Sequence, residues 1–286
     1  MLLLNWVNGR LERTIRAKRK VIALLTEQKH AVIQRTVTQG VAPSIEREPT
    51  DAPVGETPPS WEVRRLKALV INVVDQTATK TPEEIYIALE HVQSWTGRLS
   101  LQRAQGEGQF TGMVKRFRAN DVLFGKLRPY LAKVLTAPSS GVCVGEFFVL
   151  RANQALITSF FLEQLLRTVT VINTINSSTF GAKMPRADWQ FVGNLRVAVP
   201  SLQEQAMIVE SIRQETKPLD HAISRREREI EYLLEYRARL VADVVTGRLD
   251  VREFVASLPT DAACEVVTGF VAEVEGTEIA DEETEA

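Results

Sequence analysis

Ten lysines and arginines of this 286-residue chain lie in short clusters separated by Gly, Ser, Asn and Pro. The clusters are Arg98 and Arg103; Lys115, Arg116 and Arg118; Lys126, Arg128 and Lys133; and Lys183 and Arg186. Cations on such loops, together with backbone N–H groups, can bind phosphates, and arginine can also read base edges in the major groove. These ten residues are therefore candidates for DNA contacts. Each also has a structural alternative; the segment Arg128-Pro129-Tyr130, for example, could brace a turn.

Catalytic motifs do not accompany these cations. The sequence has no G-x-x-x-x-G-K-[ST] phosphate loop, no glycine-rich dinucleotide fingerprint and no [DN]-P-P-[YF] motif. His30, His91 and His221 are scattered, and the first and last are expected to be solvated on long helices. Glu27 and Lys29 match a nuclease-like E-x-K only in the middle of a helix. The sequence therefore predicts a non-catalytic binding protein with no cofactor and no metal of its own.

Charge is distributed unevenly along the chain. The net charge is −1, but from Glu253 onward there are 10 acidic and no basic residues, so the preceding 252 residues carry 35 basic against 26 acidic side chains, a net of +9. Salt screens charges over about 10 Å, so a distant acidic segment leaves the basic part able to attract a polyanion. The two cysteines, Cys143 and Cys264, lack metal-ligand spacing and fit a reducing cytoplasm. No apolar run is long enough to predict a membrane helix.

Two segments that could position the basic loops carry the same helical pattern. Seam residues recur at alternating steps of three and four, which predicts coiled-coil pairing. They are Ile15, Lys18, Ile22, Leu25, Lys29, Val32 and Thr36, and, 208 positions later, Ile223, Arg226, Ile230, Leu233, Arg237, Leu240 and Val244. The basic interruptions coincide in the two seams, which indicates a duplicated element; the alternative is two unrelated amphipathic helices. Gly40 and Gly247 are expected to end the helices, since glycine adopts the left-handed cap conformation easily.

Composition divides the chain into five parts. We expect a helical part over residues 1–40, in which the helix itself runs from Leu11 to Gln39, and then a Pro-rich linker over residues 41–59. Residues 60–200 read as an α+β domain with short strands and one convincing helix, residues 158–172. Residues 201–252 form a second helical region, with Ser201 and Glu204 predicted to make a capping box. The acidic residues 253–286 have little to bury and are expected to be disordered.

Several of these segments resemble the specificity subunit of type I restriction-modification enzymes. The resemblance is carried by "VLFGKLRPYLAKV", "GVCVGEFFVLR", "SSTFGAKMPR" and "VAVPSLQEQAMIVESI", and by the two long helices, and it covers residues 11–252. It implies an α/β target-recognition domain flanked by helices that pair antiparallel as a spacer. Complete members have two such domains, so this chain resembles their C-terminal half, either a functional half-subunit or a truncated form.

The resemblance also implies partners. A cytoplasmic, non-catalytic chain of this kind would read one half of a bipartite duplex DNA target and dock methylation (M) and restriction (R) subunits. Adenine-N6 methylation and ATP-dependent cleavage, with S-adenosylmethionine, ATP and Mg, would belong to those subunits. The helices could pair within the chain or across a homodimer, which would predict an interrupted palindrome as target. The alternative is a coiled-coil interaction protein whose basic domain binds a protein or single-stranded nucleic acid.

Overall fold

The computed structural model describes residues 2–41, 46–53, 55–100, 112–179 and 184–249. Arg103, Lys183, Cys264 and the predicted acidic tail lie outside these ranges. The chain divides into two compact units. One, here called the coil unit, contains Met1–Gln28 and Pro218–Ala286, and the other, the domain unit, contains Lys29–Lys217.

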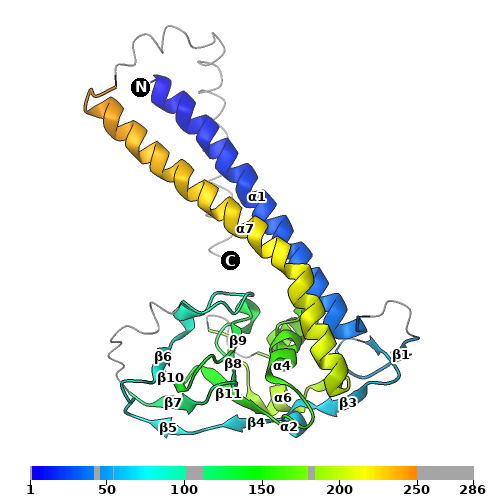
Figure 1. Ribbon diagram of the computed structural model, residues 1–286. Helices are drawn as coiled ribbons and strands as arrows, with labels where there is room; N and C mark the ends of the chain where they lie inside the picture. Colours follow the sequence, from blue (N-terminus) through cyan, green and yellow to red (C-terminus); the bar gives the residue numbers. More distant parts are fainter. Residues whose placement is uncertain (1, 42–45, 54, 101–111, 180–183, 250–286) are drawn as a thin grey trace. The chain divides into compact units, whose positions relative to one another are not determined.

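Two long helices contribute to both units. Helix α1 spans Leu2–Gln39 and helix α7 spans Leu202–Val245. Within the coil unit they run side by side in opposite directions (Figure 1), since Glu12 meets Arg237 while Lys18 meets Glu229. The helices end before Gly40 and Gly247, whose φ angles of 78° and 72° confirm the predicted left-handed caps.

The first helix begins nine residues earlier than the sequence suggested. The expected start at Leu11 was wrong because residues 2–10 continue the helix. Part of the reason is local: the Arg10 guanidinium lies 4.9 Å from the centre of the Trp6 ring, one helical turn away. In α7, Pro218 lies inside one continuous helix rather than separating two helical segments.

The domain unit is built around two four-stranded sheets (Figure 1). In one sheet the strand order is β4-β11-β8-β9, all antiparallel; in the other it is β5-β7-β10-β6, with only the β10–β6 pair parallel. The strands are β4 Val70–Val73, β5 Gln76–Thr77, β6 Ile85–Ile87, β7 Val114–Phe117, β8 Val122–Gly125, β9 Val134–Thr136, β10 Gly141–Val144 and β11 Phe147–Ala152. Tight turns from β7 to β8 and from β10 to β11 carry the chain from one sheet to the other.

The central strands are buried on both faces, which explains their uninterrupted apolar runs. Phe124 and Phe148 join the larger core, which includes the helices α4 Ser159–Leu166 and α5 Val169–Ser177, whereas Leu123 and Phe147 join a smaller core with β6 and β10. A separate two-stranded sheet pairs β3, Glu62–Arg65, with β12, Arg196–Val199. The remaining short helices are α2 Leu66–Leu69, α6 Trp189–Asn194, and the 3-10 turns η1 Leu89–His91 and η2 Pro129–Leu131.

Three local predictions were wrong. The single helix expected over residues 158–172 is two helices, since Thr168 has an extended backbone and its hydroxyl donates to the carbonyl of Leu165. The Pro-rich linker contains a small hairpin, β1 Glu48–Pro49 with β2 Glu56–Thr57. Ser201 accepts the N–H of Glu204 as predicted, but the Glu204 carboxylate accepts from Trp61 Nε1 at 3.0 Å instead of completing the capping box.

Candidate nucleic-acid interface

Two basic segments that are far apart in sequence come together in the domain unit. Residues 126–128 and 185–187 exchange backbone hydrogen bonds, from Arg128 N to Pro185 O and from Ala187 N to Lys126 O, both 2.8 Å. Leu127 and Arg186 form an isolated antiparallel bridge. We call Lys126, Arg128 and Arg186, with Glu146, the basic platform.

Glu146 lies on the turn between β10 and β11 and anchors this platform. Its backbone carbonyl accepts from Lys126 N at 2.8 Å, and its half-buried carboxylate accepts from the Arg186 guanidinium at 3.2 and 3.3 Å. Since the platform contains three cations and one carboxylate, it keeps a net positive charge that favours an anionic partner.

Arg128 begins a rigid turn on this platform. Its φ and ψ of 51° and 63° are left-handed, and Ala132, at φ 46°, closes the same turn. Leu131 N donates to Arg128 O at 2.9 Å, and Trp95 N donates to Leu131 O at 3.1 Å. The Arg128 side chain is exposed. Tyr130 and Met184 lie next to these two segments and are exposed. The sequence reasoning, which followed charge, named Tyr130 only as part of a turn and did not name Met184.

Lys115 is placed differently from the other candidates. Its ammonium group is buried and donates to the Phe147 carbonyl at 2.7 Å. Burial lowers the pKa of Lys115, and the nearby charge of Lys126 lowers it further. These contacts favour a structural role, in which Lys115 holds β7 to the start of β11.

The remaining candidates do not join the platform. Arg116 pairs with Glu84 at 3.6 Å, and Lys133 donates to the Leu89 carbonyl at 2.6 Å. Arg118 is exposed on the turn before β8, whereas Lys126 follows β8, so the length of that strand separates them. Arg98 is exposed on a loop after η1.

A buried ion pair supports the turn that carries Arg118, and the sequence reasoning missed it. Asp121, almost fully buried, accepts from the backbone N–H of Arg118 at 2.8 Å and from Nη2 and Nε of Arg151 at 2.8 and 2.9 Å. The pairing links residues 30 positions apart, and no local motif indicates it. It fixes where the Arg118 backbone lies and leaves its side chain in solvent.

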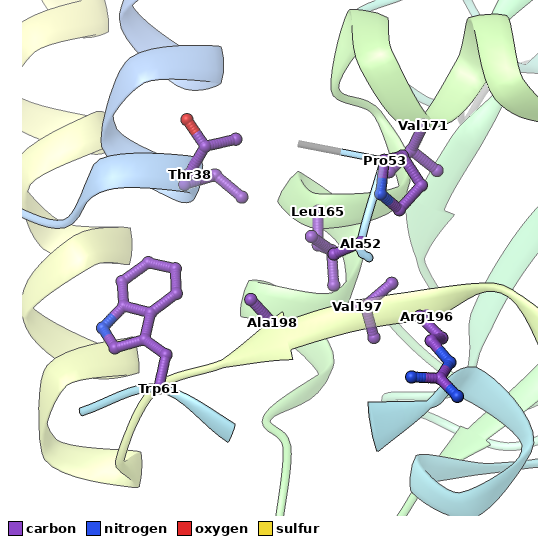
Figure 2. Close-up of a pocket in the computed structure, with 10 residues that line it drawn as sticks. Thr38, Ala52, Pro53, Trp61, Leu165, Val171, Arg196, Val197 and Ala198 are labelled. Atoms are coloured by element: carbon purple, nitrogen blue, oxygen red, sulfur yellow. The ribbon is translucent and has the colours of Figure 1, made fainter. Parts of the chain in front are cut away.

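A small hollow in the domain unit does not offer a ligand site. Its walls include side chains from the end of α1, the β1–β2 hairpin, α4, α5 and β12, with Trp61 (Figure 2). Its cavity volume is about 10 Å³, room for roughly one water, and its lining is mainly apolar. The hollow is therefore a packing junction. Across the described residues, no group of three or more His, Cys, Asp or Glu side chains could hold a metal ion.

In the coil unit the predicted seam residues are partly or fully buried. The basic residues that interrupt the apolar seam form ion pairs with glutamates of the two helices. Lys18 Nζ and Arg226 Nη1 each donate to the same Glu229 oxygen at 2.6 Å, and Arg237 meets Glu12 at 3.0 Å. The hydrogen bonds from Lys18 and then Arg226 lower the pKa of Glu229 to about 2. The apolar seam positions that are at least partly buried are Ile15, Ile22, Leu25, Ile223, Ile230, Leu233, Leu240 and Val244, and Val32 in the domain unit is also partly buried.

The histidines differ from expectation in one case. His221 is exposed, as expected. The expectation of a solvated His30 was wrong: its ring lies 4.8 Å from that of Trp95, and burial lowers its pKa. A helix surface that is solvated in isolation is covered here by a loop of the domain, which a local pattern does not reveal. His91 is buried, and its ring accepts from Ala88 N at 3.2 Å.

Comparison with known proteins places this arrangement beside type I restriction enzymes. No protein-family model matches the sequence. The type I restriction enzyme EcoDI specificity subunit of Escherichia coli is 27% identical over 133 residues, which are 46% of this chain and 29% of that relative. The chain therefore matches less than a third of the relative's length.

Solved structures were compared with this fold. A chain from work on complex assembly and conformational transition of the type I R-M system has a TM-score of 0.53 and 16% identity, covering 83% of this chain and 56% of that one. The HsdS subunit from Thermoanaerobacter tengcongensis aligns with a TM-score of 0.46 and 23% identity, over 63% of this chain and 48% of that one. The first likeness supports the mixed helix-and-strand architecture with long helices.

A membrane-spanning helix is also not found in the described part of the chain, where no helix is both long and apolar enough to cross a bilayer.

Proposed function

We propose that this chain, a homologue of type I restriction enzyme specificity subunits, recognises a sequence in duplex DNA. The observation that carries the proposal is its 27% identity, over 133 residues, to the EcoDI specificity subunit. The basic platform gives the similarity a physical basis, because Lys126, Arg128 and Arg186 present positive charge from adjoining loops. Phosphate contacts supply affinity for such a surface, and base-edge contacts supply specificity.

The paired helices would act as the spacer. A seam with cross-helix ion pairs at Lys18 and Arg237 favours one register over its alternatives. A fixed register sets a fixed distance, which a bipartite DNA target requires. Pairing within this chain would present one reading domain, and a homodimer would present two and read an interrupted palindrome.

We further propose that the chain is non-catalytic and docks onto M and R subunits in the cytoplasm. Adenine-N6 methylation and ATP-dependent cleavage would then take place in those partners, which would bring S-adenosylmethionine, ATP and Mg. The domain unit would select the site, and its partners would modify it.

The proposal is tested by duplex binding and by partner recovery. Fluorescence anisotropy at low salt should show binding to duplex DNA, with affinity falling steeply as salt increases because counterions are released. Capture of the chain from its native cells should recover an adenine methyltransferase, and the methylome should contain one split motif that requires this chain. A chain that ignores duplex DNA at low salt, or prefers single strands of the same sequence, would contradict the proposal.

A further inference from the structure

Arg128 has a backbone conformation that other residues reach at lower cost. Its left-handed φ and ψ bring the β-carbon close to the following carbonyl, a clash that glycine avoids. It also precedes Pro129, and residues before proline normally adopt an extended backbone. Strain of this kind persists where the surroundings hold it, and it is concentrated at functional sites.

The surroundings hold the Arg128 backbone firmly and leave its side chain unengaged. The N–H and carbonyl of Arg128 are both hydrogen-bonded, to Pro185 and Leu131. The guanidinium is exposed, and it makes no ion pair or side-chain hydrogen bond with any residue that the structure describes. The turn therefore presents a fixed Cα–Cβ direction with an unpaired, forked donor at its end.

Resting on the proposed function, we propose that Arg128 is a specificity-determining residue that reads a guanine in the major groove. Its planar guanidinium can donate two parallel hydrogen bonds to guanine O6 and N7, an arrangement that lysine cannot reproduce. A fixed backbone suits this contact because the two bonds demand a defined approach. Phosphates, in contrast, are bound by flexible side chains as well as by rigid ones.

The neighbours of Arg128 support base reading over phosphate binding. Lys126 already supplies a positive charge from the same segment. Arg186 is held by the Glu146 carboxylate, which repels phosphate oxygens from that side of the platform. Arg128 is thus the candidate on the platform whose guanidinium is both unpaired and rigidly mounted.

Two variants of the full chain test the assignment. Each variant is mixed at low salt with a library of duplexes that share a randomised core, and the duplexes that bind are sequenced. Arg128→Lys keeps the charge and removes the fork, so we expect total duplex affinity within about threefold of wild type. Its preference for guanine at one motif position should fall about tenfold to a hundredfold, with the other positions unchanged. Arg128→Gly relieves the backbone strain, so it should lose the same preference while its thermal midpoint rises by about 1–3 °C.

Arg213→Lys is the matched control, since Arg213 is an exposed arginine of the domain unit that lies on α7, outside the basic platform and outside the candidate DNA contacts. It should leave the motif unchanged. A wild-type motif that Arg128→Lys and Arg128→Gly both retain would overturn the assignment and leave the proposed function standing. The absence of any motif with the wild-type chain would overturn both.

Discussion

The coil unit and the domain unit use basic side chains in opposite ways. In the coil, Lys18 and Arg226 interrupt an apolar seam, and both donate to Glu229. In the domain, Arg98, Arg118 and Arg128 are exposed and make no side-chain ion pair with another described residue. A cation at the seam is neutralised inside the coil, by a carboxylate of the other helix for Lys18 and of its own helix for Arg226. A cation on an outward loop stays available for an external anion.

This difference suggests a division of labour. Paired charges in the coil contribute to register, and their effect on folding should be visible without DNA. Unpaired charges in the domain contribute little to folding, and their effect should be visible only when DNA is added. The following predictions test that division, from the largest expected effect to the smallest.

The largest expected effect is a loss of stability when a buried apolar side chain is truncated in the core of either unit. Phe161 is fully buried in the larger core of the domain, and Ile230 lies in the thinner seam of the coil. Phe161→Ala should lower the free energy of unfolding by about 3–5 kcal/mol and Ile230→Ala by about 2 kcal/mol, since a two-helix seam leaves a smaller cavity. Urea denaturation followed by circular dichroism measures both, and equal losses would contradict the contrast.

The coil should also respond to acid through Glu229. Its pKa of about 2 lies below the ordinary value of 4.5, so its ionised form stabilises the folded coil above pH 4.5. That contribution is lost as the pH falls from about 4.5 through about 2. Glu229→Gln should therefore lower the thermal midpoint at pH 7 and weaken this acid dependence. Exposed Glu231 on the same helix provides the control. A Glu231→Gln variant that lost acid dependence as Glu229→Gln does would refute the prediction.

DNA binding should separate two lysines that look alike in the sequence. Lys126→Ala on the platform should weaken duplex binding about three- to tenfold at low salt and reduce the slope of log affinity against log salt by about 0.9. Lys115→Met should leave both unchanged, because that ammonium is buried against the Phe147 carbonyl. Anisotropy titrations over a range of salt concentrations give both quantities. A loss of slope with Lys115→Met would show that this lysine reaches DNA.

The same contrast explains what the sequence could predict. The heptad steps of α1 and α7 indicated two long helices, because a seam is a local pattern repeated along one element. The antiparallel pairing of these helices was predicted from the family resemblance. The runs around Phe124 and Phe148 likewise indicated strands. The roles of Lys115 and Arg116 could not be predicted, since they depend on Phe147 and Glu84, which only the tertiary fold brings near.

The basic platform also depends on contacts between distant parts of the sequence, which local patterns do not predict. Lys126 and Arg186 were identified as separate candidates, but nothing local predicted that their segments would share backbone hydrogen bonds. The pairing of Glu146 with Arg186 depends on the same long-range contact. DNA contacts by any of these residues stay predictions until binding is measured.

The smallest effect should distinguish the two helix-ending glycines. Gly40 and Gly247 have similar left-handed backbones, so alanine costs about 1 kcal/mol of strain at either position. At Gly40 a new β-carbon would also lie 3.2 Å from the Glu204 carboxylate, which accepts from Trp61, whereas at Gly247 it would meet no described atom within 4 Å. Gly40→Ala should therefore lower the free energy of unfolding by about 1–2 kcal/mol. Gly247→Ala should lower it by less than about 0.5 kcal/mol, because the last turn of α7 can fray without unfolding the rest. Losses of equal size in urea denaturation would mean that strain alone sets the cost, and that the Trp61–Glu204 contact adds nothing to the end of α1.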